Sequence, residues 1–367
     1  MRRLASLAAA CALSACASLP GGNWISDQLD PGQGIPLTAL PGWSQGNKAA
    51  ALTSFVTSCK ALMLMPPDTS LGGSGTMTTQ IGQAGQWDSA CAAAKAVPPN
   101  NETAAQTFFQ TWFMAYAVSR HALISGYFEP EVLGSKNERP GFRVPLYAKP
   151  ALASLADLPR SAIDNGALYR KAPVTAYVAS RIDAFMLQVQ GSGRIRLTNG
   201  RILTVGFNGQ NNQPYTPIGG LLIKIGALQP DNISYQSISA WLKSHPSEAD
   251  SIMEQNQNYV YLRPLGYLPA DEGAPGALGV PLTPRHSVAI DRTALPLGAP
   301  LFIATTDPLT GDNLDLLTIA QDAGAGLQGA DQADIFFGSG HTAEAVAGLM
   351  HQHGVIYILL PRAQPAR

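Results

Sequence analysis

Residues 321–338 of the chain read QDAGAGLQGADQADIFFG. This stretch places Asp322 and Asp334 beside short apolar runs and close to glycines. A third aspartate, Asp291, follows the apolar run 287–290. A carboxylate at a strand end beside glycines is well placed to face a cleft. Any one of these aspartates could instead cap a turn, but the three together predict a site built from carboxylates.

The stretch lies in a region that begins near Leu123, in which short apolar runs alternate with Gly, Pro, Asn and Asp clusters. This pattern is typical of β-rich folds. We expect strands at 184–189, 194–198, 202–207, 259–263, 287–290, 300–303, 316–320, 335–337 and 355–360. We expect helices at 49–65, 84–96, 102–120, 218–225, 237–245 and 342–351. Aromatic residues at helical spacing between 108 and 116 predict a packing face.

The composition limits the kinds of partner. A chain of 367 residues with a hydrophobic fraction of 46% predicts two domains with ample material for cores. Only 13% of the residues are charged and the formal net charge is −1, whereas globular proteins average about 25% charged residues. Nucleic-acid binding calls for a basic patch, so we expect no nucleic acid. A neutral, hydroxyl-rich partner such as a polysaccharide fits better.

The first residues predict a lipoprotein signal peptide. A basic start at 2–3 precedes an apolar run at 4–12, which is far shorter than the roughly 20 residues that span a bilayer. The run ends in Leu-Ser-Ala-Cys at 13–16, which resembles the bacterial lipoprotein box, so we expect acylation of Cys16. Ala17 follows instead of Asp, and by resemblance to Gram-negative lipoproteins this favours the outer membrane, with the protein facing the periplasm. Several acyl chains would hold the protein on the membrane stably.

Two motifs that suggest a cofactor lack the context that a cofactor site needs. Residues 324–329 fit G-x-G-x-x-G, but a dinucleotide site requires a following helix, and 330–337 leads into another β-like run. His351 and His353 form an H-x-H pair without a third ligand at a usual spacing. We therefore expect no cofactor and no metal ion.

Two cysteines, Cys59 and Cys91, remain after the signal region. In an oxidising periplasm two thiols could pair. The sequence does not give their distance, so pairing and two buried free thiols both stay open.

Motifs spread along the chain resemble one known family. Together the three aspartates resemble the three-aspartate domain of membrane-bound lytic transglycosylase A. The sequence SGYFEP at 125–130 looks like that family's entry motif, and IDAFMLQVQGSG at 182–193 looks like its central signature. Further matches, in the family's order, are VGFNGQN at 205–211, Tyr215 and NYVY at 258–261. One departure lies in DAGAGLQG at 322–329, where Gln328 stands in place of the family's usual lysine.

The resemblance implies a mainly β (β-rich α+β) fold. It implies a double-psi β-barrel domain and a second, inserted β-barrel domain, with a groove between them. Carried onto this chain, residues 1–16 are the signal peptide, 17–127 and 257–367 build the double-psi barrel domain, and 128–256 form the insert.

The resemblance also implies an activity. The family cleaves the β-1,4 bond between N-acetylmuramic acid and N-acetylglucosamine in peptidoglycan, and the muramic acid C6 hydroxyl, not water, attacks C1 to leave a 1,6-anhydro end. Because the substrate carries its own nucleophile, one carboxyl suffices as acid and then base. Asp334 aligns with the family's catalytic acid, and it needs a raised pKa from burial or a neighbouring carboxylate. Asp322 is the expected neighbour, and Asp291 is a third, more structural member.

Substrate-binding residues are expected in the same motifs. Amide and hydroxyl groups hydrogen-bond sugars, and aromatic rings stack on sugar faces. Each of these side chains could equally satisfy local backbone groups. The predicted binding residues are Tyr127, Gln188, Gln190, Gly191, Ser192, Gly193, Asn208, Gly209 and Tyr215.

Two other functions stay open at this point. A hydrolytic endoglycosidase would use two aspartates and a water, with carboxyls roughly 6.5–9.5 Å apart. A non-catalytic lipoprotein would bind peptidoglycan without turnover, and Asp334→Asn would then have no effect.

Overall fold

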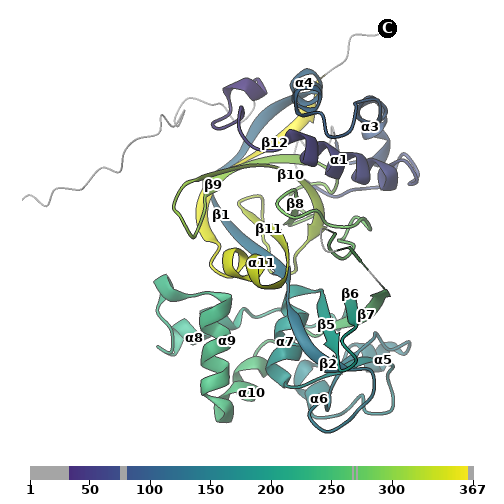
Figure 1. Ribbon diagram of the computed structural model, residues 1–367, viewed down its shortest axis with the longest axis vertical. Helices are drawn as coiled ribbons and strands as arrows, with labels where there is room; N and C mark the ends of the chain where they lie inside the picture. The colour runs from purple at the N-terminus through teal and green to yellow at the C-terminus, as the bar shows by residue number, and fades with distance from the viewer. Residues whose placement is uncertain (1–32, 75–80, 267, 270–271, 363–367) are drawn as a thin grey trace, which may run out of the picture. The chain divides into compact units, whose positions relative to one another are not determined.

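The computed structural model describes residues 33–74, 81–266, 268–269 and 272–362, which form two sheets (Figure 1). The first is a closed six-stranded barrel in the order β1-β11-β8-β10-β9-β12. Its strands are β1 (Phe113–Glu129), β8 (Ser287–Ile290), β9 (Pro300–Thr306), β10 (Asn313–Ala323), β11 (Gln332–Ser339) and β12 (His351–Pro361). The pairs β1–β11 and β8–β10 are parallel, and the others are antiparallel. Closure leaves the barrel without a free strand edge.

The second sheet has the order β3-β4-β2-β5-β6-β7 and comes from the chain between β1 and β8. Its strands are β2 (Glu131–Ser135), β3 (Val144–Tyr147), β4 (Val174–Val178), β5 (Gly193–Leu197), β6 (Ile202–Gln210) and β7 (Val260–Gly266). The predicted β-rich fold with an inserted second sheet is confirmed. The second sheet is an open half-barrel, with β3 and β7 at its two edges. The predicted domain limits and the groove stay predictions.

Helices flank both sheets. Those before the barrel are η1 (Leu37–Ala39), α1 (Lys48–Leu62), η2 (Ala84–Trp87), α3 (Asp88–Lys95) and α4 (Glu102–Trp112). Those in the inserted part are α5 (Ala153–Ala156), α6 (Arg160–Asp164), α7 (Arg181–Gln190), α8 (Ile218–Lys224), η3 (Pro230–Asn232), α9 (Tyr235–Ser244) and α10 (Pro246–Glu254). The last helix, α11 (Gly340–Ala347), connects β11 to β12 and lies against β1 (Figure 1).

An aromatic cluster packs α1 and α4 together beside the barrel. Phe55 is fully buried, and its ring lies 5.9–6.3 Å from the rings of Trp87, Phe108, Phe109 and Phe113. Fully burying one such side chain stabilises a fold by about 1.5–3 kcal/mol. Phe108, Phe109 and Phe113 of the predicted packing face therefore form core, whereas Trp112 and Tyr116 are partly exposed.

One predicted strand is a helix. Residues 184–189 lie inside α7, whose first turn is capped by Ser180, which accepts a hydrogen bond from the N–H of Asp183 (3.0 Å). Gly191, at φ 77°, ends the helix. Successive residues of α7 pack into two different core clusters, so both of its sides are covered. The apolar run therefore lacks the polar face by which a helix is recognised in a sequence.

Two predicted helices are too long. The helix expected at 102–120 ends at Trp112, and β1 begins at Phe113. Pairing of β1 with β11 and β12, which come from the far end of the chain, overrides the local helical pattern. The helix expected at 342–351 ends at Ala347, because His351 already belongs to β12.

A buried polar network fastens α1 to β10 directly before Asp322. The Gln321 amide nitrogen donates to the carbonyl of Ser54 (3.0 Å) and to the hydroxyl of Ser58 (2.8 Å). Its amide oxygen accepts hydrogen bonds from the hydroxyls of Ser54 (3.0 Å) and Ser287. Because every group in this network is partnered, it fixes one packing of α1 on the barrel.

Cys59 and Cys91 form a disulfide between α1 and α3, with their Cα atoms 5.4 Å apart. The question that the sequence left open is thereby answered in favour of pairing.

Replacing both cysteines by serine is expected to lower the free energy of unfolding by about 3–4 kcal/mol. The bond joins residues 32 positions apart and so restricts the unfolded chain. Urea denaturation of the variant and of the wild type measures the difference, and wild type with a reductant should match the variant. An unchanged midpoint at an unchanged slope would contradict this expectation.

Candidate active site

Asp334 and Asp322 lie on the two strands that flank β8. Asp334 belongs to β11 and Asp322 to β10, and both are register partners of the same residue, Ala289. Adjacent strands are about 4.8 Å apart, so the backbones of the two aspartates are about 10 Å apart across one intervening strand. The barrel topology thus brings together two carboxylates that the sequence analysis singled out.

Asp334 has the environment of a neutral acid. Its carboxyl hydrogen-bonds the side chain of Ser125, its register partner on β1. Its Oδ1 is buried and has no hydrogen-bond partner among the described residues. Burial raises the pKa of Asp334 to about 7, the charge of Asp322 contributes to the rise, and the Ser125 hydrogen bond opposes it. Since an unpartnered buried oxygen is costly when charged, geometry and pKa both favour the protonated form near neutrality.

Asp322 accepts hydrogen bonds on both oxygens. The Tyr127 hydroxyl donates to Oδ2 (2.8 Å), and the backbone N–H groups of Ala277 and Ala323 donate to Oδ1 (2.9 Å each). Burial raises the pKa of Asp322, and these three hydrogen bonds oppose the rise. All three groups are donors, which is the arrangement that suits a carboxylate.

Asp291 fastens a turn and the glycine loop. Its Oδ1 accepts from the backbone N–H (2.8 Å) and the hydroxyl (2.7 Å) of Thr293, and its Oδ2 accepts from the N–H of Gly329 (2.8 Å). Burial raises the pKa of Asp291, but these hydrogen bonds outweigh it and the net shift is downward. These contacts support the expectation that Asp291 is a structural member of the three.

The two predicted tyrosines lie close to Asp322 and Asp334. Tyr127 is 7% exposed, and its ring lies 5.2 Å from that of Phe336. Tyr215, between β6 and α8, is half-buried, and the charge of Asp334 contributes to the raised pKa of its phenol after burial itself. A side chain at Gly326 would approach the Tyr215 ring to 3.0 Å, so the glycine loop and Tyr215 are neighbours. Their sugar-stacking roles stay predictions.

The glutamines of the central signature hold parts of the protein together. Gln188 is buried, and its amide oxygen accepts from the Arg160 guanidinium (2.7 Å). The Gln190 amide oxygen accepts from the backbone N–H of Phe128 at the end of β1 (3.0 Å). Gly191 supplies the left-handed residue that ends α7. The described structure gives all three a local role, and their contact with substrate stays a prediction.

The other predicted binding residues lie on β5 and β6. Gly193 packs tightly, because a Cβ there would lie 2.1 Å from Leu187. The side chain of Asn208 accepts from the backbone N–H of Lys149 (2.9 Å), and Gly209 has φ 110°. These contacts order β5 and β6, two inner strands of the sheet, without testing a role in binding.

No role was predicted from the sequence for two buried charged residues that contact the predicted binding residues Gln188 and Ser192. The first is Glu129, which is fully buried and lies 3.2 Å from the Arg194 Nε. It also accepts from the N–H of Ala274 (2.6 Å) and the hydroxyl of Ser192 (3.4 Å). Burial raises the pKa of Glu129, and these partners oppose the rise. Its place in the SGYFEP motif was the available signal.

The second is Arg160, which is 2% exposed. Besides Gln188 it donates to the carbonyls of Asn256 (2.8 Å) and Asn258 (2.7 Å), so it ties α6 and α7 to the start of β7. Apart from Asp164, with which it forms an ion pair at 3.8 Å, its partners lie far away in the chain, and no sequence signal marked it.

The two motifs that suggested a cofactor are the glycine loop 324–329 and the pair His351 and His353 at the start of β12. Within the described ranges, no group of three His, Cys, Asp or Glu side chains is placed to hold a metal ion. The glycine loop 324–329 is followed by the strand β11 and not by the helix that a dinucleotide site needs.

Known proteins share this arrangement. Residues 156–263 match the family model of the MltA specific insert domain, and residues 286–360 match that of the 3D domain. The solved structure of LtgG, a lytic transglycosylase of Burkholderia pseudomallei, is 34% identical, covers 92% of this chain and 98% of its own, and has a TM-score of 0.59. The chain belongs to the membrane-bound lytic murein transglycosylase A (MltA) family.

Other MltA relatives agree. The crystal structure of a membrane-bound lytic murein transglycosylase from Agrobacterium tumefaciens has a TM-score of 0.80 at 27% identity, over 90% of this chain and 97% of its own. Membrane-bound lytic murein transglycosylase A of Escherichia coli (strain K12) is 32% identical over 245 residues, which are 64% of each chain. The match therefore spans less than two thirds of that relative's length. MltA membership confirms the resemblance drawn from the motifs.

Proposed function

We propose that the chain is a lytic transglycosylase that cleaves the β-1,4 bond between N-acetylmuramic acid and N-acetylglucosamine in peptidoglycan and leaves 1,6-anhydromuramoyl ends. The observation that carries the proposal is Asp334, whose Oδ1 is buried without a partner among the described residues and whose pKa is raised to about 7. A carboxyl held neutral near pH 7 can act as a general acid. Relatives named lytic murein transglycosylases support the substrate class.

One carboxyl performs both proton transfers. Neutral Asp334 donates its proton to the glycosidic oxygen as the bond from that oxygen to C1 of muramic acid breaks. The resulting Asp334 carboxylate then takes the proton of the C6 hydroxyl while O6 forms its bond to C1. The enzyme ends in its starting protonation state and no water is consumed. The nearby Asp322 carboxylate stabilises positive charge on the sugar and favours the protonated form of Asp334.

The hydrogen bonding of the other aspartates favours this reaction over hydrolysis. A hydrolase needs a second carboxylate that activates water. Asp322 and Asp291 each accept hydrogen bonds on both oxygens from protein groups. Both carboxylates are thus already engaged, whereas Asp334 keeps an unpartnered oxygen within the described structure.

The products decide between the three functions. Purified sacculi are digested with the protein and the muropeptides are analysed by mass spectrometry. Anhydromuropeptides, lighter by one water than reducing-end products, establish the transglycosylase. Reducing ends would instead show a hydrolase, and binding without any product would show a scaffold.

We also propose that an acylated Cys16 anchors the protein on the outer membrane, facing the periplasm. Relatives carry the name membrane-bound, and the Cys59–Cys91 disulfide is typical of an oxidising compartment. Within the described ranges, no helix has the length and hydropathy to cross a bilayer. Cys16 itself lies outside the described residues.

Replacing Cys16 by alanine is expected to move the protein from the membrane fraction to the soluble fraction, because the acyl chains supply the membrane affinity. Fractionation of cells followed by immunoblotting measures the distribution. Cys11→Ala, in the same signal region, is the matched control and should leave the protein on the membrane. A Cys16 variant that stays on the membrane would refute the anchor.

A further inference from the structure

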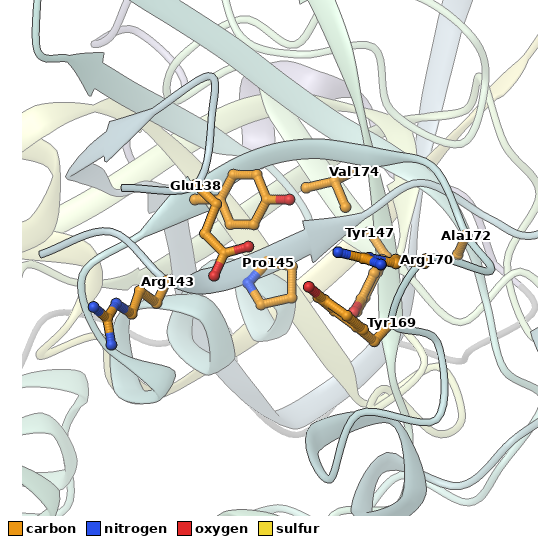
Figure 2. A pocket seen from close by; sticks show the side chains of 9 residues that line it. Glu138, Arg143, Pro145, Tyr147, Tyr169, Arg170, Ala172 and Val174 are labelled. Atoms are coloured by element: carbon orange, nitrogen blue, oxygen red, sulfur yellow. The ribbon is translucent and has the colours of Figure 1, made fainter. Parts of the chain in front are cut away.

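The part of the chain between β1 and β8, which forms the second sheet, contains a cavity apart from the three aspartates. Its volume is about 270 Å³, residues of β3 and β4 line it, and it adjoins a second cavity of about 220 Å³. Figure 2 shows the side chains that line the larger cavity. The two cavities share Arg143, Pro145, Tyr147 and Tyr169 as lining residues. None of the three aspartates lines either cavity, so this is a feature separate from the candidate active site.

The polar side chains around the larger cavity have few partners of their own. Within the described part of the chain, these side chains make no hydrogen bond or ion pair, and the Arg170 guanidinium lies against the Tyr169 ring. Four of them, Glu138, Arg143, Tyr169 and Arg170, are exposed. Tyr147 is only 4% exposed, and burial raises the pKa of its phenol, so this hydroxyl stays protonated and able to donate. The six side chains concerned are Glu138, Arg143, Tyr147, Tyr169, Arg170 and Tyr177.

Arg170 is held in a backbone conformation that disfavours it. Its φ is 56°, in the left-handed region, which costs a residue with a side chain about 1–2 kcal/mol relative to the right-handed one. Its guanidinium lies 5.2 Å from the centre of the Tyr169 ring, at the side of the cavity (Figure 2). Glycine would fit this backbone without strain. An arginine kept at such a position points to a use for its side chain.

The charge of the cavity selects a class of ligand. Three of its nine lining residues are charged, two arginines and one glutamate, whereas only 13% of the whole chain is charged. Guanidinium groups bind carboxylates through paired hydrogen bonds, and a carboxylate binds an ammonium group. While a stem is attached, the lactyl carboxyl of muramic acid is held in an amide bond, so the sugars of a stem-bearing strand carry neither charge. The peptide stems attached to muramic acid carry both, and tyrosine rings can cover their aliphatic parts.

We propose that this cavity binds the peptide stem of peptidoglycan, with Arg143 and Arg170 holding its carboxylates and Glu138 facing its ammonium group. The inference rests on the proposed function in so far as peptidoglycan is the substrate. It adds a second point of attachment, by which the protein distinguishes peptide-bearing glycan from bare glycan.

The first test is direct binding of the free tetrapeptide stem, released from sacculi by an amidase, to the full chain in detergent. Isothermal titration calorimetry should show binding that weakens with added salt. The double variant Arg143→Ala with Arg170→Ala should bind about tenfold more weakly, which corresponds to about 1.4 kcal/mol. Arg201→Ala removes an exposed arginine of the same half-barrel outside the cavity and should bind like the wild type. Absence of binding, or a double variant that binds like the wild type, would overturn the proposal.

Arg170→Gly separates a binding role from a structural one. It relaxes the backbone at φ 56°, so thermal stability should be unchanged or higher while binding of the stem falls. A variant that loses stability and keeps binding would show that Arg170 serves the fold instead.

Bare glycan strands, whose muramic acid carries a free lactyl carboxylate once the stem is removed, complete the test. Their binding to the Asp334→Asn chain should be the same with and without the double variant. An equal loss for bare glycan would make the cavity a site for the sugars or their lactyl carboxylates and overturn the peptide assignment. Release of anhydro ends from bare glycan by the wild type tests the proposed function separately. The transglycosylase function and the peptide-stem site can therefore be refuted independently of each other.

Discussion

Asp334→Asn is expected to lower the rate of anhydromuropeptide release by about 10³–10⁴-fold, because one side chain supplies both the acid and the base of the reaction. The amide keeps the size of the carboxyl but can neither give up nor take up the proton. Release of products from sacculi, followed by mass spectrometry under single-turnover conditions, measures the loss. The matched control is Asp312→Asn, an exposed aspartate in the turn between β9 and β10, which should cleave at the wild-type rate. If Asp334→Asn releases anhydromuropeptides at a rate within tenfold of the wild type, another residue carries out the proton transfers.

The stability of the same variant shows that lost activity is not lost folding. Burial raises the pKa of Asp334 from 3.8 to about 7, so in this interval the folded state binds the proton more tightly than the unfolded state does. The contribution of Asp334 to the stability of the wild type is therefore lost as the pH rises from below 3.8 through about 7. Asp334→Asn has no charge to bury and should be the more stable protein above that interval. Thermal midpoints at a mildly acidic and a mildly alkaline pH measure this.

Short-range patterns predicted the strands from β5 to β12, but they indicated no strand at β2, β3 or β4. The strand expected at 287–290 is β8 in full, because three apolar residues after Ser287, between turn signals, leave few other structures. The prediction of a helix at residues 113–120 was wrong, because β1 forms only through pairing with strands from the other end of the chain. The prediction of a strand at residues 184–189 was wrong for a different reason. Because α7 is covered on both sides, its apolar run resembles a buried strand.

The candidate site was predicted unevenly. The three aspartates were predicted as site residues because they lie beside glycines and strand-like apolar runs. The family resemblance then implied a role for each of them. Arg160 and Glu129 were not predicted, because a buried charge is stabilised only by its partners, and Arg160 bonds residues 188, 256 and 258. The hydrogen bond from Tyr127 to Asp322 joins residues 195 positions apart and likewise appears only in the folded barrel.

Asp322→Asn is expected to move the alkaline limb of the pH–rate profile to lower pH. Protonated Asp334 is the active acid, so kcat/KM falls as the pH rises through its pKa of about 7. The negative charge of Asp322 is one cause of that raised pKa. Removing the charge lets the pKa of Asp334 fall, and the limb should follow. The variant also loses charge stabilisation of the sugar cation, so kcat at the best pH should fall by about 10²-fold.

The shift of the limb can be separated from a general loss of activity. Asp291→Asn removes a carboxylate from the same barrel that is tied to Thr293 and Gly329 and is not a cause of the raised pKa of Asp334. It should lower stability, because it weakens three hydrogen bonds, and leave the alkaline limb in place. Profiles of kcat/KM on glycan strands for the two variants and the wild type decide the matter. If the limb of Asp322→Asn coincides with that of the wild type, burial alone sets the pKa of Asp334, and the role of Asp322 is confined to the charge on the sugar.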